Sequence, residues 1–319
     1  MAKIKILSAI PDFAPKGKKI LSSLGRIDYL KLNQPQLEKI IGQYEILIVG
    51  LGLNINNTVI NQGKKLKYIA TVTTGLDHID VNYAQKKGIK IISLKGEKKF
   101  LREITGTAEL AFGLMINLAR NIIPGTESLK NYRWERYKFI GHNLSGQTLG
   151  IFGFGRLGKL MAQYAQGFNM KIIAYDPYLK TKKKIKGLNY QLVNFKKLIS
   201  SSDIISIHAT LTKETENIFN QKVFSKMKKS ALLINTARGK IVNEKDLLIA
   251  LKQKKISGYA TDVLADELLF VKKIKKNSLI EYAKNNSNMI ITPHVGGLTY
   301  ESRLATDIFI AQKIKTILE

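Results

Sequence analysis

The sequence has no cysteine among its 319 residues, and only four histidines, six prolines and one tryptophan. Without cysteine the chain has no disulfide and no thiolate nucleophile, and a structural zinc site is not expected. No apolar run approaches the ~20 residues that cross a bilayer. The apolar patch near the N-terminus is too short for a signal peptide and stops at Pro11-Asp12. We therefore expect a cytoplasmic protein with no metal site and no membrane segment.

Acidic residues are scarce as well. The 24 Asp and Glu residues stand against 52 Lys and Arg, which gives a formal net charge of +28. Such an excess can indicate binding to nucleic acid, to a membrane surface or to anionic substrates. The lysines, however, are spread along the chain, mostly in predicted loops and helix ends, and aromatic residues are not interleaved with them as base stacking requires. We interpret most of this charge as solvated surface and keep nucleic-acid binding as the weaker alternative.

The clearest local pattern lies in residues 147–176. An apolar run from Thr148 to Phe152 predicts a buried parallel strand. Three glycines at G-x-G-x-x-G spacing come next: Gly153, Gly155 and Gly158. Apolar residues then recur every three or four positions, as on one face of a helix, and a second strand from Lys171 to Tyr175 ends at Asp176. This order predicts a dinucleotide-binding unit, with a plain βαβ unit that turns on glycines as the alternative.

Each part of this stretch has a physical reason to bind a dinucleotide. The first glycine allows a sharp turn, the second leaves room for a pyrophosphate, and the third lets the helix pack closely on the sheet. The N–H groups at the start of the helix face the phosphates. Asp176 can accept both ribose hydroxyls of adenosine and would repel a 2′-phosphate, so NAD is favoured over NADP. The predicted cofactor contacts here are Gly153, Gly155, Arg156, Leu157, Gly158 and Asp176.

Residues 1–95 alternate short apolar strands with amphipathic helices, which is typical of a small doubly wound α/β domain. The predicted strands are Ile4 to Leu7, Ile46 to Val49, Tyr68 to Val72 and Ile89 to Ile92. The predicted helices are Lys18 to Leu24, Gln36 to Gln43, Val59 to Gly63 and Val81 to Lys87. Two loops, 50–53 and 73–78, follow strands at the edge where open α/β sheets bind ligands, although either can be no more than a turn.

From residue 96 the pattern changes to one long predicted helix, Glu103 to Arg120, and a loop-rich stretch, 131–146, that holds Trp134. This crossover is a candidate for a hinge and for a dimer surface, and the sequence does not separate the two roles. After Asp176 the alternation resumes. Its strands are Asp203 to His208, Ala231 to Thr236, Ile256 to Val263 and Met289 to Ile291, and its helices are Phe195 to Ser200, Asn220 to Met227 and Asn243 to Gln253.

The last segment, residues 298–319, predicts a helix that can return to the first domain and make that domain discontinuous. The apolar residues expected on one side of this helix are Leu304, Ile308, Ile314 and Ile317. We therefore expect an α/β protein of two doubly wound parallel-sheet domains with a cleft between them. Residues 1–100 and 296–319 form a flavodoxin-like substrate domain, and residues 101–295 form a Rossmann NAD-binding domain.

Three residues of suitable chemistry follow predicted strands: Arg238, Glu267 and His294. Arginine offers a fixed fork of donors to a carboxylate and an adjacent carbonyl oxygen. Histidine can give a proton to that oxygen or remove it, and a glutamate bonded to the imidazole would orient it and favour its charged form. Each residue also has a simpler interpretation: Arg238 can form a surface ion pair, Glu267 can be an acid at the start of a helix, and His294 can be a hydrogen-bonded structural residue. Beside a dinucleotide site, the three together favour hydride transfer.

The chain resembles the D-isomer-specific 2-hydroxyacid dehydrogenase family nearly from end to end. The matching motifs are Thr74 to Asp80, Thr107 to Glu109, Leu144 to Gly150, the glycine fingerprint, Leu233 to Gly239 and Thr292 to Gly297. The resemblance implies interconversion of a D-2-hydroxyacid and its 2-oxoacid with NAD, in a homodimer whose domains close on a hinge. It also implies that Arg238, Glu267 and His294 form the catalytic set.

The resemblance places further residues around the two ligands. Asp262 would contact the nicotinamide amide and Thr107 would lie near the nicotinamide, while Thr74 and Gly75 would offer backbone N–H groups to the substrate carboxylate. The remaining predicted cofactor contacts are His208, Thr236, Ala237 and Gly296, and the remaining substrate contacts are Leu53 and Arg238.

Three positions depart from the family pattern. Members commonly have Asn where His78 stands, Gly where Thr73 stands and Pro where Thr210 stands. His78 and Thr73 lie in the substrate loop, so the substrate of a particular family member cannot be assigned to this chain. We expect no C-terminal regulatory domain, because only one short helix follows His294. An alternative from another class is a binding module that senses NAD(H) without turnover, like the corepressors that resemble this family.

Overall fold

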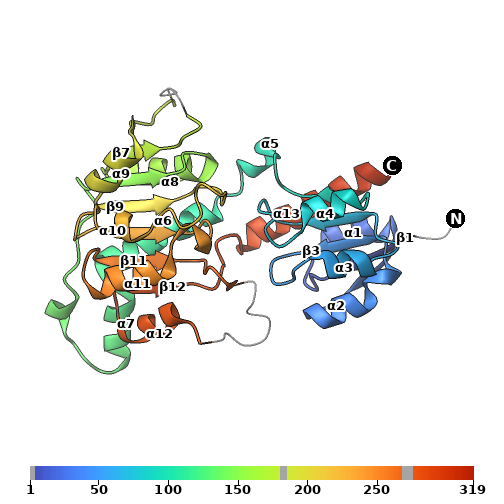
Figure 1. Ribbon diagram of the computed structural model, residues 1–319, viewed down its shortest axis with the longest axis horizontal. Helices are drawn as coiled ribbons and strands as arrows, with labels where there is room; N and C mark the ends of the chain where they lie inside the picture. The colour runs from blue at the N-terminus through green and yellow to red at the C-terminus, as the bar shows by residue number, and fades with distance from the viewer. Residues whose placement is uncertain (1–3, 180–184, 268–275) are drawn as a thin grey trace. The chain divides into compact units, whose positions relative to one another are not determined.

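The structure is a computed structural model that describes residues 4–179, 185–267 and 276–319 (Figure 1). The chain divides into two compact units. The described part of unit 1 comprises residues 4–104 and 298–319, and that of unit 2 comprises residues 105–179, 185–267 and 276–297. Each unit has its own sheet and its own core, so each is described by itself.

The sheet of unit 1 has five strands, all paired in parallel, in the order β2-β1-β3-β4-β5. The strands are β1 (Ile4–Ser8), β2 (Gly25–Tyr29), β3 (Ile46–Val49), β4 (Tyr68–Thr71) and β5 (Lys90–Ile92). This is the strand order of a flavodoxin-like doubly wound sheet. The α/β prediction for the first part of the chain is therefore confirmed.

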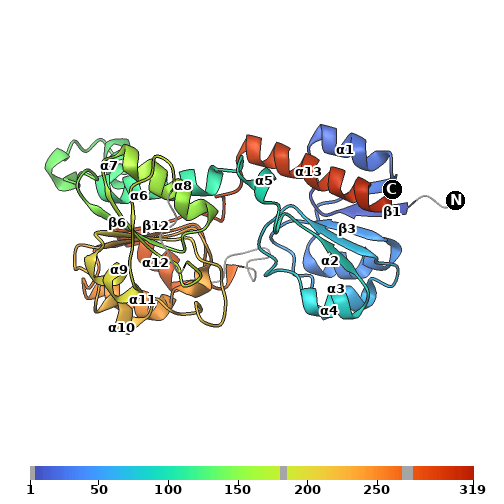
Figure 2. The same cartoon turned by 90° about the horizontal axis from the view of Figure 1, so that it is seen from above.

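Helices cover both faces of this sheet. One face carries α1 (Pro15–Ser22) and α13 (Tyr300–Leu318), and the other carries α2 (Gln34–Ile40), α3 (Asn57–Gln62) and α4 (Val81–Lys86) (Figure 2). Because side chains alternate along a strand, Ile6 packs with Ile310 of α13, whereas Leu7 packs with Leu37 of α2. The C-terminal helix thus belongs to the core of a sheet made from the first residues of the chain.

The buried side of α13 differs from the expected one. Leu304 and Ile317 are 50% and 40% exposed, whereas Ile314 is buried, so these residues do not share one buried side. The buried residues are Ser302, Thr306, Asp307, Ile310, Ala311 and Ile314. Asp307 is 1% exposed, and its carboxylate accepts a hydrogen bond from the backbone N–H of Ala14 at 2.9 Å. The polar contact with the start of α1 turns this face inward, which an apolar pattern does not reveal.

Unit 2 has a seven-stranded parallel sheet in the order β12-β11-β10-β9-β6-β7-β8. The strands are β6 (Thr148–Phe152), β7 (Lys171–Tyr175), β8 (Gln191–Leu192), β9 (Ile204–Ile207), β10 (Leu232–Asn235), β11 (Gly258–Thr261) and β12 (Met289–Ile291). Counted from β6 the order is that of a dinucleotide-binding sheet with one strand added. The strand order reverses between β6 and β9, because β7 and β8 are added on one side of β6 and β9 to β12 on the other. This is the switch point where such sheets bind ligands.

Helices again cover both faces of the sheet in unit 2. Helices α6 (Gly106–Arg120) and α8 (Arg156–Gly167) lie on one face, where Met115 and Met161 pack against Ile151 of β6. On the other face lie α9 (Phe195–Ser201), α10 (Gln221–Phe224) and α11 (Glu244–Lys252), with α12 (Ser278–Asn285) on the same side (Figure 2). No helix in the described ranges is long and apolar enough to cross a membrane.

Several short elements were not expected from the sequence. They are β2, β8, α5 (Lys98–Leu101), α7 (Ile122–Lys130), α12 and the single-turn helices Arg136–Phe139 and Gly239–Ile241. The predicted helix Gln36 to Gln43 is present as α2 and the single turn Ile41–Gln43 that follows it. Strand β2 reads GRIDY, and none of its residues is fully buried. An edge strand of this kind lacks the apolar run that marked β1 and β3. Its pairing with β1 is what makes it a strand.

Candidate active site

The strands of unit 2 end side by side, and this register collects the residues that follow them. The last residues of neighbouring strands are paired: Phe152 with Ile207, Ile207 with Asn235, Asn235 with Thr261, and Thr261 with Ile291. The residue that directly follows each strand therefore lies at the same edge of the sheet. These residues are Gly153, His208, Thr236, Asp262 and Thr292. All but Thr292 are predicted site residues, although they are far apart in the sequence.

The three fingerprint glycines differ in the space around them. Gly153 has φ of 91°, and a Cβ there would lie 2.6 Å from the backbone N of Ala209. A Cβ on Gly158 would lie 2.3 Å from the carbonyl oxygen of Gly153. A Cβ on Gly155, by contrast, meets no described atom within 4 Å. The first and third glycines are thus required by the protein's own packing, and the second stands beside open space where a pyrophosphate can approach.

Arg156 and Leu157 form the first turn of α8, directly after Gly155. The first four N–H groups of a helix have no partner within it, and the dipole at this end favours an anion. Burial lowers the pKa of Arg156, but a guanidinium remains charged at neutral pH. A diphosphate at the start of α8 would therefore meet N–H groups and a cation.

Asp176, at the end of β7, also holds the fingerprint loop. Its Oδ2 accepts a hydrogen bond from the backbone N–H of Phe154 at 2.9 Å, and its Oδ1 accepts one from the backbone N–H of Tyr178 at 3.0 Å. A carboxylate has about four acceptor sites, so each oxygen can still accept a ribose hydroxyl. The sequence pattern did not indicate that this carboxylate also fixes the turn between the first two glycines.

Two buried polar atoms at the strand ends have no hydrogen-bond partner among the described residues: Nδ1 of His208 and Oγ1 of Thr236. The other ring nitrogen of His208 lies 2.8 Å from the hydroxyl of Ser206. Burial lowers the pKa of His208 to about 4, so the ring is neutral at pH 7. Unpartnered buried polar atoms are rare in native proteins, and these two lie at the edge that carries the glycine loop. The residues present therefore fit a bound dinucleotide.

Asp262, which follows β11, holds the segment around His294. Its Oδ1 accepts hydrogen bonds from the Thr292 hydroxyl at 2.5 Å and the Val295 N–H at 2.8 Å. Its Oδ2 accepts one from the Gly296 N–H at 2.7 Å. Asp262 is 1% exposed, so these bonds are shielded from water. The segment is thus tied to β11 on both sides of the histidine.

Thr107 comes to the same place from α6. A Cβ on Gly296 would lie 3.0 Å from Oδ2 of Asp262 and 3.3 Å from Cγ2 of Thr107. The structure therefore brings three predicted cofactor contacts together, although one lies in the helix before the sheet and the others follow its last two strands. A Cβ at position 296 would require Asp262 or Thr107 to shift by a few tenths of an ångström.

Glu267 and His294 form a direct hydrogen-bonded pair. Oε1 of Glu267 lies 2.6 Å from Nδ1 of His294, and Oε2 of Glu267 accepts a hydrogen bond from the backbone N–H of Leu264 at 3.1 Å. An ionised carboxylate can only accept, so we assign the proton to Nδ1, which leaves Nε2 for chemistry. His294 has φ of 55°, a left-handed conformation in which His, Asn and Asp are enriched among non-glycine residues.

Arg238 lies in a turn that is packed against the loop of Glu267. A Cβ on Gly239 would lie 2.1 Å from the carbonyl carbon of Leu264 and 2.3 Å from the N of Ala265, so only glycine fits there. The guanidinium of Arg238 donates to the carbonyl oxygen of Ala237 at 2.7 Å. Two loops that carry predicted catalytic residues are therefore in backbone contact.

Glu244 is a half-buried acid beside these loops that sequence reasoning missed. Its Oε1 accepts a hydrogen bond from the Ala265 N–H at 2.7 Å. Burial raises the pKa of Glu244, and the charges of Asp266 and Glu267 act in the same direction. Glu244 opens α11 only six residues after Arg238, and that short spacing is the one sequence signal that could have indicated it.

The predicted substrate contacts other than Arg238 lie in unit 1. The two loops that hold them are joined through Ile55, whose N–H donates to the carbonyl oxygen of His78 at 2.7 Å and whose carbonyl accepts from the Asp80 N–H at 2.9 Å. Leu53 is 7% exposed and its side chain packs in the core of unit 1. A ligand would therefore meet the backbone at Leu53, whereas Thr74 is exposed.

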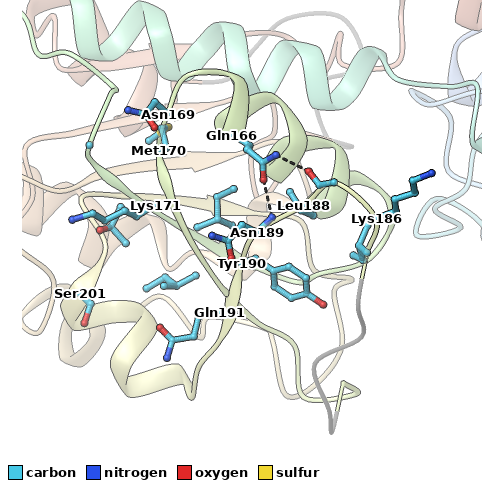
Figure 3. A pocket seen from close by; sticks show the side chains of 16 residues that line it. Gln166, Asn169, Met170, Lys171, Lys186, Leu188, Asn189, Tyr190, Gln191 and Ser201 are labelled. Carbon is cyan, nitrogen blue, oxygen red and sulfur yellow. Dashed lines mark hydrogen bonds between the residues drawn. The ribbon is translucent and has the colours of Figure 1, made fainter.

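A separate cavity of about 1350 Å³ lies at the amino ends of β6 and β7. Gln166 spans one wall of it, donating to the Gly187 carbonyl at 2.6 Å and accepting from the Asn189 N–H at 2.7 Å (Figure 3). Its lining contains none of the predicted site residues, and open α/β sheets bind ligands at the opposite strand ends. No cluster of three or more His, Asp or Glu suited to a metal occurs in the described part of the chain.

Comparison with known proteins places this chain among dehydrogenases. Residues 112–296 match the family model described as D-isomer specific 2-hydroxyacid dehydrogenase, NAD binding domain. A D-3-phosphoglycerate dehydrogenase of Methanocaldococcus jannaschii is 36% identical over the whole chain, which covers 58% of that protein. A hydroxypyruvate reductase of Thermotoga maritima is 36% identical over 89% of this chain and 88% of its own length.

Solved structures with a similar fold include a D-2-hydroxyacid dehydrogenase. D-lactate dehydrogenase from Aquifex aeolicus, solved with NAD and lactic acid, has a TM-score of 0.85 at 27% identity and covers 98% of this chain and 95% of its own. The chain spans only a little over half the length of several curated relatives, such as 58% and 54% of two D-3-phosphoglycerate dehydrogenases.

The contact at Gly239 gives a first prediction. Gly239→Ala places a methyl group against backbone that cannot rotate away, so we expect the free energy of unfolding to fall by about 3 kcal/mol. Gly167→Ala is the matched control, because a Cβ there meets no described atom within 4 Å, and alanine should add roughly 0.5–1 kcal/mol at the end of α8. Urea denaturation of both variants measures the difference. Equal stabilities would contradict the close approach of the two loops.

Proposed function

Because the chain belongs to the D-isomer specific 2-hydroxyacid dehydrogenase family, we propose that it interconverts a D-2-hydroxyacid and its 2-oxoacid with NAD. The observation that supports this most is the 2.6 Å contact between Glu267 and His294 in the unit that carries the glycine fingerprint. A paired acid and imidazole is the arrangement that acid/base chemistry at a carbonyl oxygen needs. Bound NADH would supply the hydride for reduction of the 2-oxoacid.

His294 is the proposed acid/base. With Nδ1 donating to Glu267, Nε2 is the nitrogen that gives a proton to the carbonyl oxygen in reduction and removes it in oxidation. Glu267 keeps the ring in one tautomer and one orientation. Asp262 holds the segment of the histidine, since it bonds to Thr292, Val295 and Gly296. Each of these residues acts on the position of one imidazole.

The substrate carboxylate would be held by Arg238 and by backbone groups of unit 1. A guanidinium binds a carboxylate through two parallel N–H bonds. Among the described residues, no hydrogen bond uses the backbone N–H of Thr74 or of Gly75. Both groups therefore remain available to an anion, which supports their predicted role. We place Asp262, Thr107, His208, Thr236, Ala237 and Gly296 around the nicotinamide half of the cofactor.

Turnover with a panel of acids tests this proposal. Glyoxylate, hydroxypyruvate and pyruvate would be offered with NADH, and D-3-phosphoglycerate with NAD, while absorbance of NADH is followed. Reduction or oxidation of at least one acid supports the enzyme. Binding of NADH without turnover of any acid would instead favour a binding module. We also propose that the protein works in the cytoplasm.

Replacement of the histidine separates chemistry from binding. His294→Asn removes the proton donor but keeps a residue type that tolerates φ of 55°. We expect turnover to fall by about 10²–10⁴-fold, with the Kd for NADH changed less than about twofold. His142→Asn, at an exposed histidine in the same unit, should leave both unchanged. Turnover within tenfold of the native value in His294→Asn would remove His294 as the acid/base.

Asp176 determines cofactor choice in this proposal. Asp176→Ala should weaken NADH binding, because it removes the ribose acceptor and the bond to Phe154 N–H. It should also remove repulsion of the 2′-phosphate, so the preference for NADH over NADPH should fall by about tenfold, which is 1.4 kcal/mol. Fluorescence titration with each cofactor gives both values. An unchanged preference would show that another residue selects the cofactor.

The segment 122–140 supports a homodimer. Neither α7 nor the single-turn helix Arg136–Phe139 buries any residue. Seven large apolar residues of this segment are exposed: Ile122, Ile123, Leu129, Tyr132, Trp134, Tyr137 and Ile140. Soluble proteins rarely expose so many apolar side chains in one place unless another surface covers them. We propose that a second copy of the chain covers this segment.

Solution mass tests the dimer. Trp134→Ser combined with Tyr137→Ser removes two side chains that are 80% and 77% exposed, and we expect the native dimer to become a monomer in light scattering after gel filtration. Tyr178→Ser is the control, since Tyr178 is 82% exposed but lies outside the segment. A variant that keeps the dimer mass would exclude this segment as the interface.

A further inference from the structure

The loop after β4 contains two residues that the proposed mechanism does not use, Thr73 and His78. They stand on either side of Thr74 and Gly75, whose N–H groups are the proposed donors to the substrate carboxylate. His78 is 1% exposed and Thr71, the last residue of β4, is 0% exposed. The side chains of His78 and Thr71 are therefore too deeply buried to contact a substrate directly.

A continuous hydrogen-bond chain runs from this buried histidine to the loop backbone. Nε2 of His78 lies 3.3 Å from the hydroxyl of Thr71, and that hydroxyl lies 2.9 Å from the hydroxyl of Thr73. The Thr73 hydroxyl donates to the carbonyl oxygen of Gly75 at 2.7 Å. Three side chains thus connect the core of unit 1 to a peptide group in the proposed carboxylate site.

The chemistry of these groups fixes the direction of every bond. The carbonyl of Gly75 can only accept, so the single proton of the Thr73 hydroxyl is used there. Thr73 must then accept from Thr71, whose own proton is used in turn, and Thr71 must accept from His78. Nε2 of His78 therefore carries a proton. A chain with one direction polarises its members cooperatively, and its buried part does not exchange partners with water.

The histidine end of the chain is itself fixed by the backbone. The carbonyl oxygen of His78 accepts from the Ile55 N–H at 2.7 Å, and the N–H of the next residue, Ile79, donates to Leu76 at 2.9 Å. At the other end, the carbonyl of Thr73 accepts from the Leu94 N–H at 3.2 Å. The tether therefore runs from a rigid anchor to the turn at Thr74 and Gly75, whose own N–H groups carry no bond among described residues.

We propose that Thr73 and His78 are positioning residues that hold the Gly75 peptide so that the N–H groups of Thr74 and Gly75 converge on the substrate carboxylate. This rests on the proposed function, because it assigns those N–H groups to the substrate. The tether pulls the Gly75 carbonyl toward Thr73 and away from the anion. Without it the turn can rotate that carbonyl, with its negative end, toward the carboxylate.

Thr73→Val tests the hydroxyl, because valine has the same shape and cannot donate to Gly75. We expect the KM for the best 2-oxoacid of the panel to rise about tenfold, the order expected for one lost hydrogen bond. The Kd for NADH should stay within about twofold, since Thr73 lies in the other unit from the glycine fingerprint. Thr73→Ser keeps the hydroxyl and should restore the native KM. A native KM in Thr73→Val, or the same rise in Thr73→Ser, would overturn the proposal.

The histidine is tested through its coupling to Thr73. His78→Phe removes the donor at the start of the chain, and the double variant with Thr73→Val measures whether the two act as one unit. Residues in a shared network are not additive, so the KM of the double variant should be close to that of the worse single variant. Additive increases in KM would show that His78 acts independently of Thr73 and would overturn the proposed role of His78.

Amide hydrogen exchange measures the tether without any substrate. Ile79 and Leu94 donate their N–H groups to the loop carbonyls of Leu76 and Thr73. Peptides that contain these two amides should exchange about tenfold faster in Thr73→Val than in the native protein or in Thr73→Ser, while peptides over 289–297 serve as an internal reference. Equal exchange in all three would overturn the proposal. If the native protein reduces no acid of the panel, the proposed function fails, and the exchange result still decides whether the hydroxyl chain holds the loop.

Discussion

Parallel pairing in register is the constraint on which the candidate site depends. Because β6, β9, β10, β11 and β12 end level with one another, the five residues that follow them share one edge of the sheet. Most of the loops beyond that edge are then held by contacts with backbone atoms: the Asp176 carboxylate bonds to the glycine loop, the Asp262 carboxylate to the segment of His294, and Gly239 lies against Leu264 and Ala265. The sheet brings the loops to one edge, and the carboxylate hydrogen bonds and close glycine contacts then restrict the conformations of these loops.

Much of this arrangement could be predicted, because buried parallel strands are continuous apolar runs. The ranges expected for β3, β6, β7 and β12 agree with the structure, and the doubly wound fold and the family are confirmed. Strand β2 and the buried face of α13 could not be read in this way. Their places depend on pairing and polar contacts with distant residues, such as Asp307 with Ala14, and these contacts leave no apolar period in the sequence.

In the candidate site, too, some features could be predicted from the sequence and others could not. Residue type and a place after a strand were enough to single out Arg238, Glu267 and His294, and the hydrogen bond expected between the last two is present. Their catalytic roles stay predictions. The second tasks of Asp176 and Asp262, the packing at Gly239 and the acid at position 244 were not foreseen. Each comes from two loops meeting in space, and sequence spacing alone does not tell which loops meet.

The discontinuity of unit 1 has a consequence for the newly made chain. Its five strands leave the ribosome early, but α13, which supplies Ile310, Ala311 and Ile314 to the core on one face of the sheet, is translated only after unit 2. While unit 2 is synthesised, α1 alone covers that face. Unit 2 can therefore complete its fold first, against the usual order in which N-terminal parts finish before C-terminal ones. A nascent chain paused before α13 would present a ready surface to chaperones.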